Sequence, residues 1–179
     1  MHLLLLSLLA SSALALPVAA QVAPAPKDTV ATRYQLPGAD CALFPAAASM
    51  GTWNDEHLIR SGRFTPTHEQ VATTEKALPA VHLQDIYEHR VASYYDDYPA
   101  IIQNHLPEYN RQYYGFYNAQ HQACLYINFF PGRYEQPSDN TALWLHWPVN
   151  VCDGGSGFWR IYYNVITHKF FNFSHNLEG

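Results

Sequence analysis

The chain has 179 residues, of which 48% are hydrophobic and only 14% are charged. This length and composition suit one folded domain with a core of ordinary size, and they exclude disorder for most of the chain. The formal net charge is −5, and Lys and Arg form no cluster in the sequence. We therefore expect neither nucleic acid nor an anionic membrane surface as a partner.

Residues 1–20 resemble a secretory signal peptide. An apolar run over residues 3–16 is followed by Val18-Ala19-Ala20, a small-residue cleavage site before Gln21. The alternative is a membrane anchor, but the run is shorter than the roughly 20 residues needed to span a bilayer, and Pro17 interrupts it. We expect the mature chain to be secreted or periplasmic, without a membrane span.

The segment after the cleavage site, residues 21–62, is expected to be an extended, loop-like arm. Proline and glycine recur in it among small residues, and no long periodic pattern is present. Residues 63–179 are expected to form a single α+β domain, because helical patterns come first and strand patterns follow.

Two helices are predicted in the first part of this domain. The first begins near Thr65 or Thr67 and ends at Leu78, and Thr67 with Gln70 has the spacing of a capping box. The second covers residues 83–95, where apolar residues recur at helical spacing. One further short turn is expected between Ala100 and Leu106, before Pro107.

Alternation of residue types with period 2 predicts strands over residues 112–118, 123–130, 144–152, 158–165 and 169–175. The many aromatic residues favour the same assignment. Short connections rich in turn formers indicate a four- to five-stranded antiparallel meander with one buried face. The N-terminal helices are expected to cover that face.

The turn Asp153-Gly154-Gly155 is expected to join the third and fourth of these strands. The two glycines supply the positive φ angles that tight hairpin turns need. The alternative is that the glycines let Asp153 or a backbone amide approach a ligand.

Three cysteines are present, and Cys124 and Cys152 fall on the same face of neighbouring predicted strands. An oxidising compartment would allow these two thiols to form a disulfide. The alternative is two independent buried thiols, and Cys41 is left without an assigned partner.

One set of residues on the predicted second helix could bind a metal. His82, Asp85 and His89 would share one helix face, with Glu88 nearby. A solvated helix face explains the same residues, and the sequence has no His-Glu-x-x-His motif. We therefore predict no metal and no cofactor.

Evidence for catalysis is weak in this sequence. Ser156 lies between two glycines, and His146, His175 and Asp153 could serve as partners, but no Gly-x-Ser-x-Gly elbow joins a strand to a helix. A pair of Cys152 and His146 would lie about 20 Å apart on one strand. No catalytic residue is predicted.

The chain contains the motifs Arg111-Gln112-Tyr113-Tyr114-Gly115, Tyr126-Ile127-Asn128-Phe129-Phe130 and Asp153-Gly154-Gly155, and a closing strand that ends near Asn176. These motifs resemble those of a family of small uncharacterised bacterial secreted proteins and lipoproteins. The resemblance covers about residues 64–176, and Leu177 stands where the family has glycine. It implies export and a helix-plus-sheet fold, and it implies no activity. Domains of this kind often look cystatin-like, which is an analogy of fold alone.

The outward face of the predicted sheet is the best candidate for ligand binding. Aromatic and polar residues suited to carbohydrate, peptide or protein partners gather there or in the glycine turn: Tyr126, Asn128, Trp144, Asp153, Arg160 and Tyr162. The alternative is that the N-terminal arm covers this face. Our leading hypothesis is an exported, non-catalytic binding module, and the runner-up is a small secreted hydrolase or metal-dependent enzyme built around Asp153 and nearby histidines.

Overall fold

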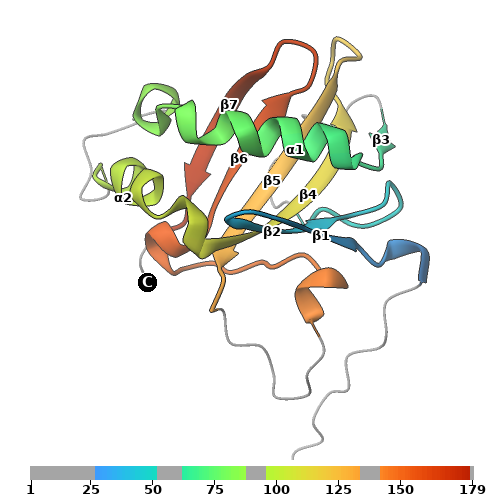
Figure 1. The fold of residues 1–179 in the computed structure, drawn as a ribbon, viewed down its shortest axis with the longest axis horizontal. Coiled ribbons are helices and arrows are strands. Elements are labelled where there is room, and N and C mark those ends of the chain that lie inside the picture. Colours follow the sequence, from blue (N-terminus) through green and yellow to red (C-terminus); the bar gives the residue numbers. More distant parts are fainter. Residues whose placement is uncertain (1–26, 52–61, 88–95, 134–141, 178–179) are drawn as a thin grey trace, which may run out of the picture.

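The computed structural model describes residues 27–51, 62–87, 96–133 and 142–177. The fold is α+β, with two α-helices on one face of a seven-stranded sheet and irregular segments on the other (Figure 1). The expected signal peptide lies outside the described residues, so export stays a prediction.

The sheet has the order β1-β2-β4-β5-β6-β7, and β3 pairs with β4 outside this path. All neighbouring strands are antiparallel except β2 and β4, which are parallel. The sheet is therefore larger than the predicted four to five strands and is not a pure meander. The strands are β1 (Thr32–Leu36), β2 (Ala39–Leu43), β3 (Arg63–Phe64), β4 (Tyr109–Tyr117), β5 (Ala123–Pro131), β6 (Trp159–Asn164) and β7 (Lys169–His175).

Four of the five predicted strands are confirmed as β4, β5, β6 and β7, which follow one another as a meander. Their alternation places one apolar row on the helical side of the sheet. Tyr113 pairs with Ile127, and Ile127 pairs with Ile161 on the next strand. The period-2 pattern therefore assigns the helical face of these strands correctly.

The N-terminal arm was expected to be loop-like, yet it contains the hairpin β1–β2. Gly38 makes the turn with a φ of 74°, and β2 then runs beside β4 in the middle of the sheet. Cys41 and Ala42 are completely buried there. The expectation was wrong because short strands of small residues carry little periodic signal, and the parallel pairing with β4 comes from a distant part of the chain.

The strand expected over residues 144–152 is absent from the described part of the chain. A short 3₁₀ turn (Leu143–Leu145) is followed by irregular backbone that crosses the second face of the sheet. Burial in this segment does not follow the alternation, because Trp144, Leu145 and Val149 all pack on the second core, whereas Trp147 is exposed. Side-chain amides, described below, bind its backbone where a neighbouring strand would have done so.

The first helix is confirmed as α1 (His68–Ala77) and crosses the sheet at a steep angle (Figure 1). Thr67 and Gln70 form the predicted capping box: the Gln70 amide donates to Thr67 Oγ1 over 3.2 Å, and the Thr67 amide donates to Gln70 Oε1 over 3.0 Å. Pro79 lies in a 3₁₀ turn directly after the helix.

The prediction of a second helix over residues 83–95 is wrong at its beginning. Residues 83–86 form a 3₁₀ turn, and Tyr87 is extended and makes a parallel bridge with Phe173 of β7. His82 and Asp85 therefore do not lie on a continuous helix, and His89 and Glu88 lie outside the described residues. The short turn expected near Ala100 is α2 (Tyr98–Asn104).

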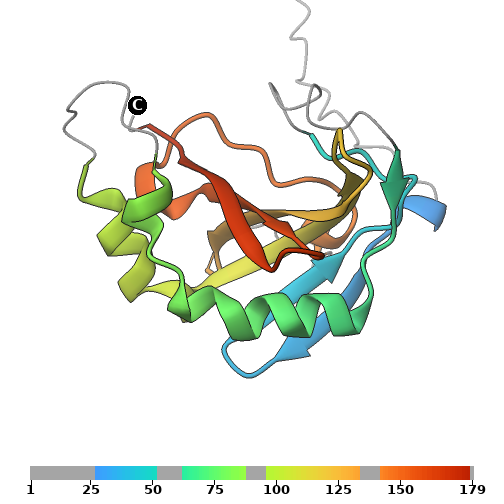
Figure 2. The same cartoon turned by 90° about the horizontal axis from the view of Figure 1, so that it is seen from above.

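Both faces of the sheet are buried, whereas one buried face was expected. The helical side holds Val71, Leu78 and Ile102 against Leu125, Ile127, Phe129, Trp159 and Ile161 of the sheet. The second side holds a separate cluster, in which residues 44–50 and 142–149 cover Tyr114, Phe116, Tyr126, Phe130 and Tyr162. Figure 2 shows α1 and the segment 142–152 on opposite sides of the sheet, whereas the turn at residues 155–157 lies next to α2.

Candidate functional site

A cleft of about 310 Å³ opens on the second face of the sheet, between the ends of β5 and β6 and the C-terminal residues. We call it the C-terminal cleft. Its wall combines the sheet, the irregular segment after Pro148 and the end of the chain. The polar residues that line it are Asn128, Asn150, Cys152, Arg160, His175 and Asn176, and Tyr126 and Phe158 add aromatic surface.

A row of polar residues crosses the sheet at the cleft. Gln112 pairs with Asn128, Asn128 with Arg160, and Arg160 with Ser174. Directly opposite residues on neighbouring strands share one face, so this row interrupts the aromatic surface made by Tyr126 and its neighbours. The strand register therefore brings Asn128 and Arg160 together at the cleft.

The side chain of Gln112 is 0% exposed, and its hydrogen bonds hold the irregular segment against the sheet. Its Nε2 donates to the carbonyl oxygens of Trp144 and Trp147, each over 2.7 Å. Its Oε1 accepts from Asn128 Nδ2 over 3.0 Å and from the Val149 amide over 2.8 Å. A buried amide thus satisfies backbone groups that would otherwise lose hydrogen bonds on burial.

Three asparagines in the cleft wall use their amide nitrogens inside the protein. Asn128 Nδ2 also donates to the Val149 carbonyl over 2.8 Å, and Asn150 Nδ2 donates to the Gly51 carbonyl over 3.1 Å. Asn176 Nδ2 donates to the carbonyls of Val151 and Asp153. Among the described residues, none donates to the Oδ1 atoms of Asn128, Asn150 or Asn176, so these oxygens remain as acceptors.

Arg160 and His175 are the basic side chains among the described residues that line the cleft. Arg160 is the one Lys or Arg, and no Asp or Glu occurs, among the described residues that line the cleft. His175 is held as well: its Nδ1 lies 2.8 Å from the Asn176 carbonyl, and its Nε2 lies 3.0 Å from the Tyr87 hydroxyl. A proton on Nδ1 satisfies the carbonyl, and Nε2 then accepts from Tyr87, so the imidazole is positioned by two contacts.

Three of the six residues predicted to bind a ligand, Tyr126, Asn128 and Arg160, line the C-terminal cleft. Trp144 and Tyr162 lie in the second core, where they are 7% and 1% exposed. Asp153 is exposed but is not part of the cleft wall. Most of the aromatic face is therefore covered, as the alternative expected. The cover comes from the N-terminal arm and also from residues 142–149.

Three residues of the cleft wall, Asn150, His175 and Asn176, were not predicted to bind a ligand, although His175 was a candidate catalytic partner of Ser156. They come from an irregular segment and from the end of β7, and no pattern in the sequence connects them. The short closing motif near Asn176 was noticed only as part of a family resemblance. In the structure, the side-chain amide of Asn176 donates hydrogen bonds to two carbonyls that are distant in sequence, those of Val151 and Asp153.

The glycine turn has the expected positive φ angles, 95° at Gly154 and 53° at Gly155. It is not a hairpin between two strands, because it leads into a 3₁₀ turn (Gly155–Gly157) and follows irregular backbone. A Cβ atom at Gly154 would lie 2.6 Å from Cδ2 of Phe158. The need for glycine is therefore both conformational and steric.

The predicted disulfide between Cys124 and Cys152 is wrong, because all three thiols are free. Cys124 is buried and pairs with Asn164 at one end of β5, whereas Cys152 is exposed at the cleft, near Asn128. Asn128 lies four positions after Cys124 in β5, which is roughly 13 Å along the strand. A disulfide needs Cα atoms within about 7 Å, so the missing strand pairing removes the bond.

The residues considered for catalysis are not assembled into a triad. Ser156 lies in the 3₁₀ turn, where its carbonyl accepts from the Tyr109 hydroxyl over 3.0 Å. His175, in the cleft wall with Cys152, is held by Tyr87 and Asn176 as described. In the part of the chain that the structure describes, no three His, Cys, Asp or Glu residues are grouped so that they could hold a metal ion.

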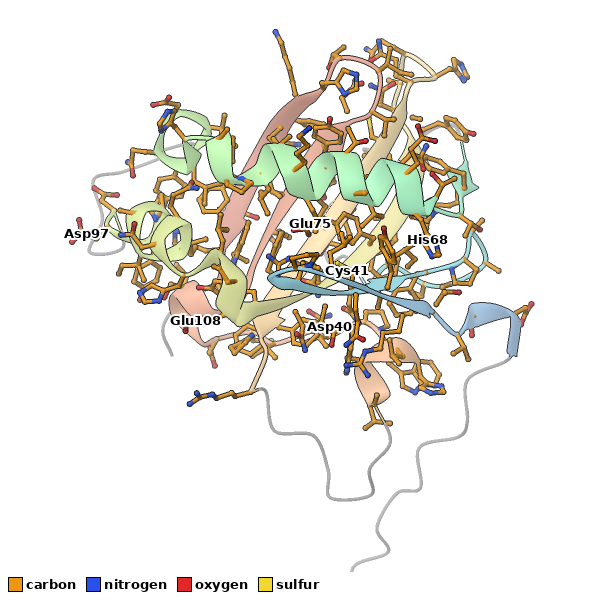
Figure 3. The ribbon with its side chains drawn as sticks, viewed as in Figure 1. Asp40, Cys41, His68, Glu75, Asp97 and Glu108 are labelled. Atoms are coloured by element: carbon orange, nitrogen blue, oxygen red, sulfur yellow. The ribbon has the colours of Figure 1, made fainter. Side chains whose placement is uncertain are left out.

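A second polar cluster lies under α1 and connects it to the sheet (Figure 3). Glu75 Oε1 accepts from the Tyr113 hydroxyl over 2.5 Å and lies 3.0 Å from Arg111 Nε and 3.9 Å from Cys41 Sγ. Burial, followed by the charge of Glu75, raises the pKa of the Cys41 thiol to about 12. Burial likewise holds the pKa of Tyr113 well above its usual value.

The role of Arg111 in this cluster is structural. Its guanidinium also donates to the carbonyls of Tyr109 and Leu106, which joins the segment before β4 to the strand itself. Glu75 and Arg111 lie at the base of a groove of about 280 Å³ between α1 and the β1–β2 turn. Their side chains are only 11% and 3% exposed, so their contacts are chiefly with each other and with the core.

Comparison with protein-family models, with curated proteins and with solved structures finds no match to this chain. The family resemblance and the cystatin-like analogy therefore stay predictions. Among the described residues, no helix is long and apolar enough to cross a membrane.

Proposed function

We propose that this protein is an exported, non-catalytic binding module and that the C-terminal cleft holds its ligand. Export and the family resemblance rest on residues 1–20 and on the short motifs given above. The observation that carries the proposal is the cross-strand pair of Asn128 and Arg160 in the wall of the cleft.

The chemical groups of the cleft wall, and the hydrogen bonds that hold them in place, suit the binding of a ligand. It combines three asparagine carbonyls and a basic residue with aromatic side chains such as Tyr126 and Phe158, which is the usual mixture of a few polar groups on an apolar frame. Hydrogen bonds made by the side-chain amides of Gln112, Asn128 and Asn176 hold the irregular wall against the sheet. A wall fixed in this way loses little conformational entropy when a ligand binds.

Cys152 allows a direct test, because its thiol is exposed at the cleft and the other two thiols are buried. The exported chain is labelled at Cys152 with an environment-sensitive fluorophore such as acrylodan. It is then titrated with neutral and acidic monosaccharides and with short peptides. The proposal predicts a saturable change in fluorescence with at least one of these compounds.

The matched control moves the fluorophore to the other end of the sheet. Thr167→Cys in a Cys152→Ser background places it in the exposed β6–β7 turn, beside Asn164. This reporter should not respond to the compound that changes the Cys152 reporter. No response at Cys152 to any compound, an equal response at both positions, or turnover of the bound compound would contradict the proposal.

A further inference from the structure

We infer that the C-terminal cleft selects a neutral sugar, that is, an uncharged ring that carries several hydroxyls. The inference rests on the proposed binding function and narrows it to one class of ligand. It follows from the fixed orientation of three asparagine amides, from the lack of a carboxylate among the described residues of the wall, and from the size of the cleft.

The asparagine amides of the cleft wall are held in one orientation. The Nδ2 atoms of Asn128, Asn150 and Asn176 donate to backbone carbonyls of the protein over 2.8, 3.1 and 3.0 Å. Rotation of any of these amides by a half turn would set its oxygen against a carbonyl oxygen, which repels it. The protein therefore fixes which atom of each amide is left for a ligand, and that atom is Oδ1.

These three oxygens require a ligand with several hydrogen-bond donors. Asn128 belongs to β5, Asn150 to the irregular segment, and Asn176 follows β7, so acceptors come to the cleft wall from three separate parts of the chain. None of the described residues donates to their Oδ1 atoms. A ligand that displaces water from such acceptors must replace the lost hydrogen bonds, or it binds at a cost.

The rest of the wall favours donors that carry no charge. An ammonium taken out of water needs an anionic partner, and no Asp or Glu occurs among the described residues that line the cleft. A carboxylate donates no hydrogen bond and would set its oxygens against three carbonyl oxygens. Arg160 already has an interaction within the protein, so the choice of ligand rests on the asparagines. Neutral hydroxyls meet these acceptors without either cost.

The size and the apolar part of the cleft suit one sugar ring. Its volume of about 310 Å³ lies at the lower end of the range of ligand sites, roughly 300–1,000 Å³. Val151 and Leu177 add apolar surface for the C–H groups of a ring, and Leu177 is 57% exposed. A peptide fits less well, because each N–H that it donates is accompanied by a carbonyl oxygen that needs a donor of its own.

The first test varies the charge on one ring. The ¹⁵N-labelled wild-type protein is titrated with D-glucose, D-galactose and D-mannose, and with the 6-carboxylate and the protonated 2-amine of each. Shifts of the backbone amide signals of Asn150 and Asn176 report the affinities. We expect at least one neutral hexose to bind, and to bind at least about tenfold more tightly than both of its charged forms.

The second test removes donors from the ligand and leaves the protein unchanged. Deoxyfluoro forms of the hexose that binds replace one hydroxyl at a time by fluorine, which has a similar size but donates no hydrogen bond. We expect at least two of these replacements to weaken binding by about three- to tenfold each. Full affinity of every deoxyfluoro form would overturn the inference.

A third test removes one acceptor from the protein. Asn150 is exposed, and Asn150→Ala should weaken binding of the neutral hexose by about three- to tenfold. Asn104→Ala is the matched control, since it removes the same side chain from an exposed position of α2 outside the cleft wall, and it should leave the affinity unchanged. Asn150→Asp supplies a carboxylate and should shift the preference towards the protonated amine. Hexose binding that Asn150→Ala does not alter would overturn the inference.

The outcomes separate this inference from the proposed function. A charged form that binds as tightly as the neutral hexose, or binding of a short peptide but of no sugar, overturns the neutral-sugar inference and leaves the binding function in place. No response to any compound overturns both. A neutral hexose whose affinity falls with fluorine replacement and with Asn150→Ala supports both.

Discussion

The hydroxyl of Tyr113 donates to Oε1 of Glu75 over 2.5 Å, and this contact joins the last turn of α1 to the middle of β4. The same carboxylate oxygen lies 3.0 Å from Nε of Arg111, although the Nε–H is not directed at it. The contact with Arg111 is therefore an ion pair, and the hydrogen bonds to this oxygen come from the Tyr113 hydroxyl and the Cys41 thiol. A buried charge pair of this kind costs desolvation, so removal of one partner leaves the other charge unpaired.

We predict that Glu75→Ala lowers the free energy of unfolding by about 3 kcal/mol, because the nearly buried Arg111 loses its counter-charge. Glu69→Ala is the control, since Glu69 is an exposed carboxylate in the first turn of the same helix. That change should cost no more than about 1 kcal/mol. Urea unfolding measures both, and equal losses would contradict the role given to Glu75.

The three thiols should differ sharply in reactivity. Burial raises the pKa of Cys41 to about 12 and that of Cys124 to about 11, so neither forms much thiolate near neutral pH, whereas Cys152 is exposed. Alkylation of the native protein at pH 8 should add one group, and Cys152→Ser should abolish it. Denaturation should expose all three thiols, and an intact mass that shows a disulfide would contradict the structure.

Stability should decline at alkaline pH. The folded state raises the pKa of Cys41 to about 12 and that of Tyr113 well above 10, whereas the unfolded chain loses these protons near pH 9 and pH 10. The unfolded state therefore binds fewer protons above pH 9, and the free energy of unfolding falls as pH rises towards the folded values. Tyr113→Phe should make the decline shallower by about 1.4 kcal/mol per pH unit above pH 10. Urea unfolding at pH 8 and pH 11 would refute this if it gave the same free energy.

Gln112→Leu should detach the irregular segment from the second face of the sheet. The change removes four hydrogen bonds and leaves buried backbone groups without partners, which we expect to cost about 3 kcal/mol. Gln35→Leu makes the same substitution at an exposed position of β1 and should be nearly neutral. Urea unfolding compares the two variants. An equal effect would show that the buried amide is dispensable.

Gly154→Ala should be more harmful than Gly62→Ala. Both glycines have a positive φ, 95° and 104°, so both substitutions cost about 1 kcal/mol of backbone strain. Only at Gly154 does the new Cβ meet a ring, 2.6 Å from Phe158, whereas nothing lies within 4 Å at Gly62. We expect a further loss of about 1–3 kcal/mol at Gly154, measured by thermal or urea unfolding. Similar losses at the two sites would show that Phe158 moves aside freely.

The sequence predicts the elements whose signal is local. The capping residues Thr67 and Gln70 determine where α1 begins, and alternation in β5 identifies which side Leu125, Ile127 and Phe129 face. These features depend on neighbours a few residues away, which is why period and capping rules find them.

The errors come from contacts between distant parts of the chain. Alternation around Trp144 indicated a strand, but Gln112, 32 residues away, binds the Trp144 carbonyl from the sheet. The disulfide prediction depended on that strand and failed with it. The parallel pairing of Cys41 with Arg111, which places β1 and β2 in the sheet, has no local signal either.

The candidate site divides in the same way. Asn128 and Arg160 lie on neighbouring strands whose pattern is clear, so their meeting could be predicted. Asn150 and Asn176 enter the cleft wall from irregular backbone, and only the structure connects them.

The central claim is that the C-terminal cleft binds a ligand, and a titration of the ¹⁵N-labelled wild-type protein with the monosaccharide or peptide that changes the Cys152 fluorescence tests it most directly. The account predicts saturable shifts of backbone amide signals for Asn128, Asn150, Arg160 and Asn176. Signals in the β6–β7 turn around Thr167 should not move. Shifts that are absent, or that gather around Glu75 and the groove beneath α1, would contradict it.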